Sequence, residues 1–422
     1  METKVFDHFP KPVYKTVLSN GLTIISVDTG SKFANIQIGV RAGSFYESRN
    51  NGVAHLLEHL IYEGPARDGV HPKLKKYYDK GSSGGAQTGR FATMYDFDTY
   101  ASEGIRATLD LLSLVLDFEV DQQIMDLEKK VVQQEIEQKK PDPGRRLEEW
   151  RNSKLFTQYP SLHRCNMGTE ESVAALAPED IIRFHKQHYH LANMVVVVSG
   201  GVEHQALVEA LDSVSMEAKE ANTILDLKPQ YPRARYQTDR LPSSMNLIFP
   251  AIDPGLDFGH GSVLSSLLTQ VGYGLLFVKL RLEQRRVYSV SCSFAEYPFQ
   301  YMVISTRVKS RFFDQIEQEV QDAIQTIVRT DISQDLWNCV IAARLVSLRK
   351  RDEYYNDISA GRRWVETLTD MWLEDDYQEY DAIKYTSELT IDQVAAVVKD
   401  TFSEGQLGVL TVSTDHDNSK EG

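Results

Sequence analysis

The chain has 422 residues, of which 42% are hydrophobic and 25% charged, and its formal net charge is −14 at pH 7. This length and composition predict a globular protein of about two to four domains. The negative charge argues against nucleic acid or an anionic membrane as the main partner, because both repel an acidic surface. No apolar run is long enough to cross a bilayer and the first residues do not resemble a targeting segment, so we expect no membrane span and a cytoplasmic location.

Three cysteines are widely spread along the chain, at Cys165, Cys292 and Cys339. Their number is odd, and their spacing fits neither a disulfide framework nor a metal site. We therefore expect a reducing compartment and buried thiols.

Alternating apolar residues predict strands near the start of the chain. Residues 14–27 read as two strands joined at Asn20-Gly21, a dipeptide typical of tight hairpin turns. Residues 35–41 form a further alternating strand. The next predicted element is a helix that contains residues 55–59.

That helix carries the sequence His55-Leu56-Leu57-Glu58-His59. On a helix the two histidines lie about 40° apart in rotation, so both imidazoles can reach one metal ion, and Glu58 projects from the same face. A catalytic zinc needs three protein ligands, an open position for water, and a carboxylate that takes the proton from that water. The motif therefore predicts two ligands and a base, and it requires a third ligand, a carboxylate or an imidazole, from another helix.

Residues 127–139 read as a charged helix whose buried side includes Val131 and Val132. Glu128 and Glu135 are seven residues apart on this helix. Two turns of helix leave only about 20° of angular drift between them, so both carboxylates can point into one site.

The predicted elements repeat in two halves, which indicates a duplication. The first half continues with helices at 106–140, 146–155 and from 179 to about 189, followed by a strand at 194–198. The second half has predicted strands at 245–249, 287–294, 300–307 and 407–413, and helices at 260–281, 312–328, 334–350 and 391–402. Each half ends with a helix and an apolar strand, and each reads as an α+β unit of plausible domain size. The predicted domains are residues 1–214 and 236–422, joined by a linker at 215–235.

Taken together, these residues resemble the pitrilysin family, the inverzincin zinc peptidases. In that family the third zinc ligand is a glutamate about 76 residues beyond the second histidine, within an acidic helix, and counting from His59 leads to Glu135. Glu128 then matches the supporting glutamate that orients the site. The resemblance implies one Zn²⁺ per chain, held by His55, His59 and Glu135, with Glu58 as the base that activates water.

The same resemblance implies the fold. It predicts an α+β protein of two homologous α/β-sandwich domains, each a mostly antiparallel sheet packed against helices, which together form half of a clam-shell chamber. Only the first domain would bind zinc, because the first helix of the second half begins with residues 260–264, His-Gly-Ser-Val-Leu, and has no counterpart of the motif.

The second domain is expected to contribute to substrate binding. Residues 276–290 resemble the family pattern L-F-x-x-L-R-E-x-x-G-L-x-Y-S-V, with Arg281 and Tyr288 on its arginine and tyrosine positions. In the family these residues contact the bound peptide over the zinc; an arginine can hold a substrate carbonyl, and a phenol can stabilise the oxyanion. The glycine of the pattern is absent here, since Arg285 and Arg286 occupy that region.

A further family segment, G-G-x-x-N-A-x-T-x-x-D-x-T-x-Y, forms an edge strand to which the substrate peptide adds as a further strand. Thr93 fits this pattern, whereas Arg90 and Phe91 occupy its asparagine and alanine positions. We therefore expect strand addition with altered side-chain pockets. Two interpretations of Arg90 remain open: it reads an acidic side chain or a peptide carboxylate, or it is a solvated loop residue.

A family chamber needs four domains and this chain supplies two, so the resemblance implies a dimer. The chain forms either a homodimer, in which Arg281 and Tyr288 serve the zinc of the partner subunit, or a heterodimer with a metal-free paralogue. The implied function is a zinc endopeptidase that cleaves short or unfolded peptides, in oligopeptide degradation or in the processing of leader or precursor peptides. The alternative is a non-catalytic scaffold or peptide-binding subunit; the retained zinc residues favour catalysis.

Overall fold

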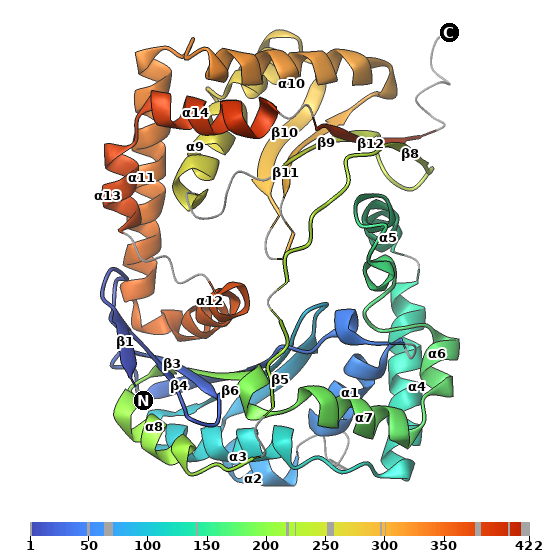
Figure 1. Cartoon of the computed structure of the whole chain (residues 1–422), viewed down its shortest axis with the longest axis vertical. Coiled ribbons are helices and arrows are strands. Elements are labelled where there is room, and N and C mark those ends of the chain that lie inside the picture. The colour runs from blue at the N-terminus through green and yellow to red at the C-terminus, as the bar shows by residue number, and fades with distance from the viewer. Residues whose placement is uncertain are drawn as a thin grey trace. The chain divides into compact units, whose positions relative to one another are not determined.

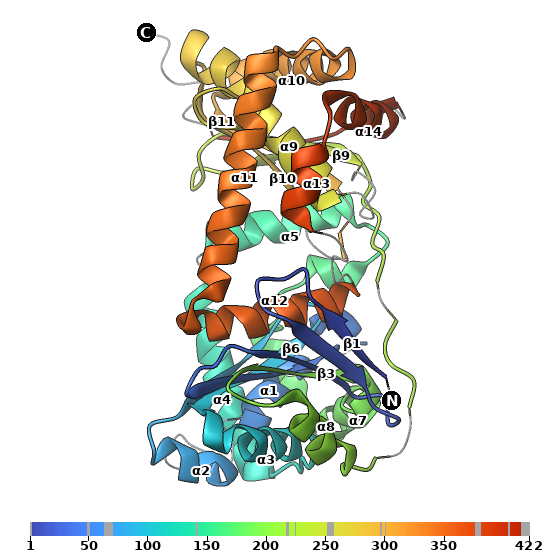
Figure 2. The same cartoon turned by 90° about the vertical axis from the view of Figure 1, so that its left-hand side faces the viewer.

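The computed structural model describes residues 2–48, 51–62, 71–140, 142–216, 219–223, 225–250, 257–295, 298–299, 301–375, 381–403 and 406–414. The chain forms two compact units (Figures 1 and 2). Unit 1 comprises Met1–Pro141, Arg164–Ile224 and Asp352–Glu379, and unit 2 comprises Asp142–His163, Leu225–Arg351 and Tyr380–Gly422.

The core of unit 1 is a seven-stranded sheet. Its strands are β1 (Thr3–Phe6), β2 (Val13–Val17), β3 (Thr23–Asp28), β4 (Phe33–Val40), β5 (Ser83–Thr88), β6 (Thr93–Tyr100) and β7 (Met194–Gly200). The order is β1-β2-β3-β7-β4-β6-β5, and only the β3–β7 pair is parallel. Every residue of β7 is buried, which suits its run of four valines in the middle of a sheet covered on both faces. Strand β5 ends the sheet.

Helices cover both faces of this sheet. They are α1 (Val53–Tyr62), α2 (Pro72–Tyr78), α3 (Gly104–Leu116), α4 (Gln122–Lys139), α6 (Glu170–Ala175), α7 (Pro178–His188), α8 (His204–Asp212) and α12 (Gly361–Glu374). Helices α1, α3 and α8 contact strands from one side, and α12 contacts β4 and β7 from the other (Figures 1 and 2). On the side of α1, α3 and α8, the buried apolar side chains of the sheet and of these helices form one continuous core.

Unit 2 repeats the plan with five strands. They are β8 (Arg233–Gln237), β9 (Ser244–Pro250), β10 (Val287–Phe294), β11 (Tyr301–Val308) and β12 (Gly408–Ser413), in the order β10-β11-β9-β12-β8, with only β12–β8 parallel. Its helices are α5 (Pro143–Leu155), α9 (Asp257–Thr269), α10 (Phe313–Val328), α13 (Ala382–Glu388) and α14 (Ile391–Ser403). Helix α11 (Gln334–Asn356) begins in unit 2 and ends in unit 1.

The two sheets, each mostly antiparallel and packed against helices, confirm the predicted fold class. The units, however, differ from the contiguous domains 1–214 and 236–422 in two segments. Helix α5 contacts β8 in unit 2, and α12 contacts the sheet of unit 1, so each half of the chain gives one helix to the other unit. Periodicity along the sequence shows that such a helix has an apolar face, but not which sheet that face will cover.

Several local expectations also differ from the structure. The predicted helix at 260–281 is interrupted: α9 ends at Thr269, and a separate π-helical segment follows at Phe277–Glu283. The predicted linker at 215–235 includes the first residues of β8. Val131 was expected on the buried side of its helix, but it is 44% exposed, whereas Val132 is fully buried. Within the described part of the chain, no helix is long and apolar enough to cross a membrane.

The expectation that all three thiols are buried is wrong at one position. Cys165 and Cys292 are buried, whereas Cys339 is exposed on α11. All three are free, as the odd number and wide spacing predicted.

Candidate metal and peptidase centre

Helix α1 is held at its first turn by a buried carboxylate. Glu47 accepts hydrogen bonds from the backbone N–H groups of Gly52 and Ala54, both at 3.0 Å, and so pairs groups that a helix start leaves unsatisfied. Gly52 has φ +95°, and a Cβ there would lie 2.7 Å from the carbonyl oxygen of Met167. Only glycine fits this turn without strain, so the approach to α1 is closely determined.

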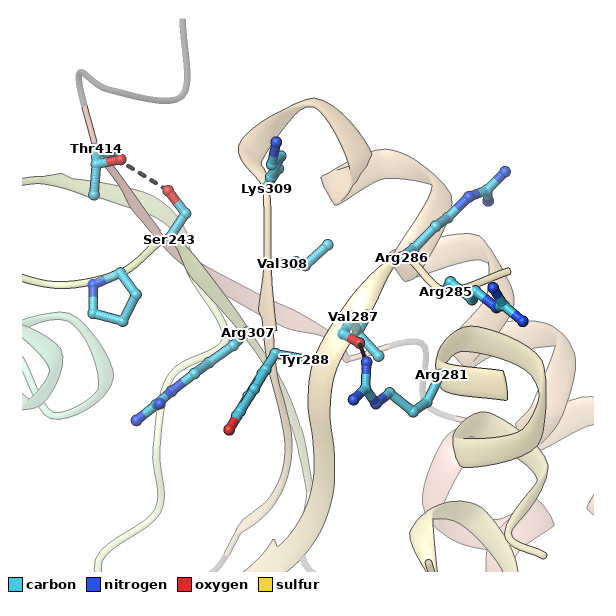
Figure 3. A pocket seen from close by; sticks show the side chains of 11 residues that line it. Ser243, Arg281, Arg285, Arg286, Val287, Tyr288, Arg307, Val308, Lys309 and Thr414 are labelled. Atoms are coloured by element: carbon cyan, nitrogen blue, oxygen red, sulfur yellow. Dashed lines mark hydrogen bonds between the residues drawn. The ribbon is translucent and has the colours of Figure 1, made fainter. Parts of the chain in front are cut away.

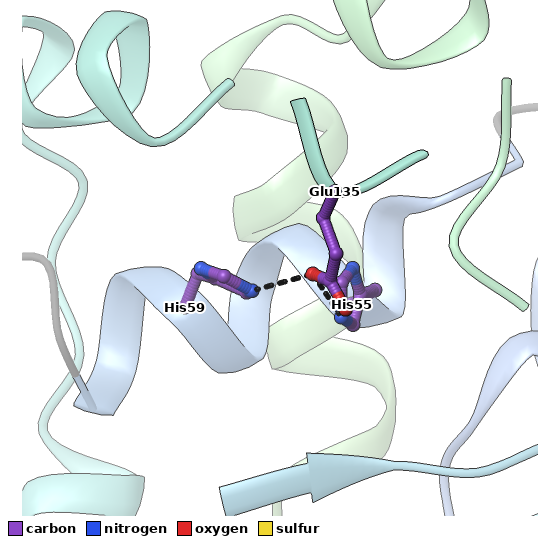
Figure 4. Close-up of side chains that lie close together, drawn as sticks. All are labelled: His55, His59 and Glu135. Carbon is purple, nitrogen blue, oxygen red and sulfur yellow. Dashed lines mark ion pairs between the residues drawn. The ribbon is translucent and has the colours of Figure 1, made fainter. Parts of the chain in front are cut away.

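Three metal-ligating side chains meet on one side of α1 (Figure 4). His55 and His59 come from successive turns of α1, and Glu135 comes from α4. One carboxylate oxygen, Oε2 of Glu135, lies 3.6 Å from Nε2 of His55 and 3.8 Å from Nε2 of His59. The potential ligand atoms all lie within 4.8 Å of one another. The structure thus brings together the three residues that the sequence predicted as metal ligands.

The predicted supporting residue, Glu128, orients one of these ligands. Glu128 lies on α4, seven residues before Glu135. Its Oε2 lies 3.2 Å from Nδ1 of His59. Because this carboxylate accepts from Nδ1, the imidazole presents an unprotonated Nε2 toward Glu135. This carboxylate–histidine arrangement is typical of metal sites.

The donor set suits a zinc ion. Tetrahedral zinc holds its ligands at about 2.0–2.1 Å, which places them roughly 3.3 Å from one another. The distances of 3.6 and 3.8 Å between Glu135 and the two histidines, and the limit of 4.8 Å for all the ligand atoms, are longer than this, so the three side chains would move closer together around a bound zinc ion. Two imidazoles and one carboxylate leave a fourth position for water or substrate.

Charges around the site favour the ligand forms of these residues. Burial, the largest cause, together with the neighbouring His59 lowers the pKa of His55 to about 4, so His55 is neutral at pH 7 and able to bind metal. Burial alone would raise the pKa of Glu135, but the hydrogen bond from Lys139 and the charge of this lysine help to bring it below its usual value. Lys139 Nζ lies 2.5 Å from Oε1 of Glu135, which leaves Oε2 for the histidines.

The predicted base, Glu58, is held in place by the edge strand. It is buried on α1, and its Oε2 accepts a hydrogen bond of 2.8 Å from the hydroxyl of Thr88, the last residue of β5. Strand β5 pairs with β6 and ends the sheet, so its outer edge is the position at which a further strand can add. The base and the candidate peptide-binding edge are therefore joined by one hydrogen bond.

Of the three predicted substrate-binding residues, Arg90 and Phe91 lie in the turn between β5 and β6, and Thr93 is the first residue of β6. Arg90 donates to the backbone carbonyl of Arg164, and the Phe91 ring is tilted against Phe45 at 5.4 Å between centroids. Thr93 is fully buried, and its hydroxyl donates to the carbonyl oxygen of Ala42. These contacts stabilise the turn between β5 and β6.

Thr88 and Lys139 are the two site residues that sequence reasoning missed. The spacing of Lys139, four residues after Glu135, is the usual signal for an ion pair along a helix. Thr88 is followed by Gly89, and a glycine often marks the end of a strand. This signal could have indicated that Thr88 ends the edge strand and that its side chain lies close to the helix with residues 55–59.

Arg281 and Tyr288 lie together in unit 2 (Figure 3). Arg281 lies in the π-helical segment Phe277–Glu283, and its guanidinium lies 5.7 Å from the centre of the Tyr288 ring. Tyr288 is the additional residue of a β-bulge, since Val287 and Ser289 pair with the consecutive residues Val308 and Arg307. Its ring is 72% exposed. A bulge that presents an exposed aromatic ring is a common way to direct a side chain toward a ligand.

Comparisons with known proteins show which family the chain resembles. A family model described as Insulinase (Peptidase family M16) matches residues 23–166, which include the three candidate ligands, and one described as Peptidase M16 inactive domain matches residues 175–343. The probable mitochondrial-processing peptidase subunit beta of Arabidopsis thaliana is 29% identical over 197 residues, and the Bos taurus subunit beta is 24% identical over 233 residues. These alignments cover 46% and 54% of this chain, and 37% and 47% of the relatives.

Solved structures match the fold over nearly the whole chain. A protease from Helicobacter pylori has a TM-score of 0.75 at 18% identity, and the alignment covers 96% of this chain and 99% of the protease. A peptidase M16 inactive domain from Pseudomonas fluorescens has a TM-score of 0.76 at 16% identity, covering 95% and 98%. These matches establish the fold, and the two family models cover both halves of the chain. The chain therefore belongs to peptidase family M16, which confirms the resemblance to the pitrilysin family seen in its sequence.

Proposed function

We propose that this protein is a zinc-dependent endopeptidase. The observation that carries the proposal is the meeting of His55, His59 and Glu135 around one point, beside a buried glutamate, Glu58, that lies on the same helix as the two histidines. Zinc held by these three residues would supply a Lewis acid for the scissile carbonyl and for the attacking water.

The residues of the chain have distinct roles in this reaction. Glu58 takes a proton from the water that attacks the peptide carbonyl and then delivers it to the amine that leaves, so no other proton donor is needed. The hydroxyl of Thr88 donates a hydrogen bond of 2.8 Å to Oε2 of Glu58 and so helps to orient this carboxylate for proton transfer. Glu128 keeps His59 in the tautomer that a metal requires.

The substrate would be a short or unfolded peptide, from oligopeptide degradation or from leader or precursor processing. Such a peptide can extend the sheet of unit 1 at β5, where backbone hydrogen bonds bind it without strong sequence preference. Arg281 and Tyr288 would hold its carbonyl groups, and the phenol would stabilise the oxyanion formed on attack. We place the protein in the cytoplasm, a location that fractionation of the producing cell would test.

We further propose a dimer, because this chain supplies two of the four domains that a chamber of this family contains. In a homodimer, Arg281 and Tyr288 would serve the zinc site of the partner subunit. A mixture of a Glu58→Gln chain and a Tyr288→Phe chain tests this arrangement. Recovery of partial activity after subunit exchange supports it, while exchange without any recovery excludes it and favours a heterodimer with a metal-free paralogue.

A non-catalytic peptide-binding subunit is the second candidate. It is favoured by one observation, the match of residues 175–343 to a model described as an inactive domain. That match lies outside His55, His59 and Glu135, and all the metal and base residues of the first half are retained. Their retention makes catalysis the better proposal.

A pool of unstructured peptides of about 10 to 40 residues, incubated with the zinc-loaded chain and followed by mass spectrometry, tests the function directly. Cleavage by the unmodified chain, but not by Glu58→Gln or by chain treated with a chelator, supports the proposal and maps the cleavage preference. Peptides that bind but stay intact under all conditions, including with a zinc-loaded chain, would favour the non-catalytic subunit.

A further inference from the structure

A basic pocket lies in unit 2 where β10 begins and β11 ends (Figure 3). It has a volume of about 570 Å³ and is lined by eleven residues. Five of them are cationic, namely Arg281, Arg285, Arg286, Arg307 and Lys309, and none is acidic. This concentration is unusual for the chain, because Asp and Glu outnumber Lys and Arg by 60 to 46 overall.

Within the described residues, none of these five cations forms an ion pair with a carboxylate. Arg281 instead donates to the backbone carbonyl of Val287 and faces the Tyr288 ring, and Arg286 lies over the ring of Phe312 at 5.5 Å. These contacts orient the guanidinium groups without neutralising them. Several like charges in one pocket repel each other, so a group of cations without an ion-pair partner among the described residues is most easily understood as a site for an anionic ligand.

The backbone at Arg285 gives independent support. Its φ is +53°, in the left-handed region, where a side chain with a Cβ is disfavoured. This is also the position at which the family pattern places glycine, the residue that adopts this conformation without strain. Strained residues that persist in a fold are concentrated at ligand-binding sites. The chain therefore carries an arginine where glycine would fit better, and the arginine lines the basic pocket.

We propose that this pocket binds an acidic segment of the peptide substrate and so selects peptides that carry several Asp or Glu side chains. Guanidinium groups form paired hydrogen bonds with carboxylates, and four of the five cations are arginines. A peptide is the natural source of the carboxylates, because Tyr288, which lines the same pocket, is the candidate contact for the peptide carbonyl. The consequence for cleavage rests on the proposed function, whereas binding itself does not.

Peptide binding by the zinc-loaded, full-length Glu58→Gln chain tests the proposal. Fluorescence anisotropy would compare three labelled, unstructured peptides of equal length that contain four Glu, four Gln or four Lys at the same positions. We expect the Glu peptide to bind at least about 10-fold more tightly than the Gln peptide, and we expect this preference to shrink as salt is added. Equal affinity for the Glu and Gln peptides at low salt overturns the proposal.

Two further variants locate the binding site. Arg285→Gly combined with Arg307→Gln should reduce the preference for the Glu peptide by about 10-fold and leave affinity for the Gln peptide unchanged. Arg349→Gln, at an exposed arginine on α11 that does not line the pocket, is the matched control and should retain the preference. Loss of the preference in the control, or its full retention in the pocket variant, contradicts the assignment of the pocket.

Stability and competition measurements separate the remaining explanations. The double variant should melt no lower than the unmodified chain, because glycine relieves the backbone strain at position 285 and Arg307 is exposed, so a loss of binding would not reflect unfolding. Inorganic phosphate at millimolar concentration should compete only weakly; a pocket that takes phosphate but discriminates no acidic peptide overturns the proposal. If the unmodified chain cleaves no peptide at all, the peptidase assignment fails, and the anisotropy results still decide the pocket.

Discussion

Helix α1 of unit 1 and helix α9 of unit 2 have equivalent places in the duplicated fold but opposite side-chain chemistry. Each follows a strand of its own sheet and contacts the next strand, β5 or β10, which ends that sheet. Helix α1 carries a buried glutamate and a partly buried histidine three and four residues after His55. Helix α9 has Val263 and Leu264 at the same spacing after His260, and both are fully buried.

The difference shows what a functional site requires of a helix. In unit 2 the two buried apolar side chains stabilise the core, and His260 is satisfied by the hydroxyl of Tyr385 at 3.0 Å. In unit 1 the same face carries groups whose burial costs energy unless each finds a partner. Thr88, Glu128 and Glu135 are those partners. Equivalent helix positions in this fold can therefore carry either apolar core residues or polar site residues. Which of the two is stable depends on whether neighbouring elements supply polar contacts.

Glu58→Gln should give the largest effect and tests whether α1 is catalytic. We expect cleavage to fall by about 1,000-fold, because loss of a general base typically costs 100- to 10,000-fold. Zinc content should stay at one ion per chain, as measured by atomic absorption. Glu119→Gln, at an exposed carboxylate, is the matched control and should cleave normally. Normal cleavage by Glu58→Gln would remove this residue from the mechanism.

Leu264→His places a histidine on α9 at the position that corresponds to His59 on α1. We expect a loss of about 2 to 5 kcal/mol in the free energy of unfolding, since a fully buried leucine is replaced by a polar group without a partner. No second zinc should bind, because the described residues around α9 do not include a group of three metal-ligating side chains. Denaturant unfolding and zinc titration measure both quantities, and Leu264→Met, which conserves volume, should cost less than about 1.5 kcal/mol.

Glu135→Gln tests whether α4 completes the site that α1 begins. We expect zinc affinity to fall by about 100-fold or more, because the neutral amide replaces a charged ligand. Glu137→Gln, two residues later on the same helix and exposed, should bind zinc normally. Competition with a chromogenic chelator gives both affinities, and unchanged affinity in Glu135→Gln would exclude it from the ligands.

A buried histidine away from the metal site should make unit 1 sensitive to acid. Burial lowers the pKa of His188 to about 4, below the unfolded value near 6.5. The unfolded chain therefore binds more protons between these values, and stability falls as the pH is lowered through this window. Between pH 7 and pH 5 we expect the unmodified chain to lose about 1 to 2 kcal/mol more than His188→Gln, as measured by urea unfolding. Parallel pH profiles of the two proteins would show that His188 is not responsible.

Thr88→Val gives the smallest effect and tests the contact between β5 and the base. Removal of the hydroxyl should lower kcat about 10-fold, with zinc affinity and KM unchanged, because it frees Glu58 without touching the ligands. Thr88→Ser keeps the hydroxyl and should restore most of the activity. An equal loss in both variants would indicate a packing role for Thr88 instead.

The sequence predicted the fold class, most strands and helices, and the residues that converge on α1. These predictions depend on local periodicity and on motif spacing, and both can be counted directly in the sequence. The π-helical interruption after α9 and the exposure of Val131 were missed, because local pattern does not report which face a neighbouring element covers.

What the sequence determined by itself is the set of chemical groups: two histidines and a glutamate on one helix, and two further glutamates on another. Only the tertiary structure decided that helices α5 and α12 are exchanged between the units, that Thr88 at the end of β5 contacts Glu58, and that five cations gather in one pocket. These features join residues distant in sequence, and their distances follow from packing and strand register, which no single segment encodes.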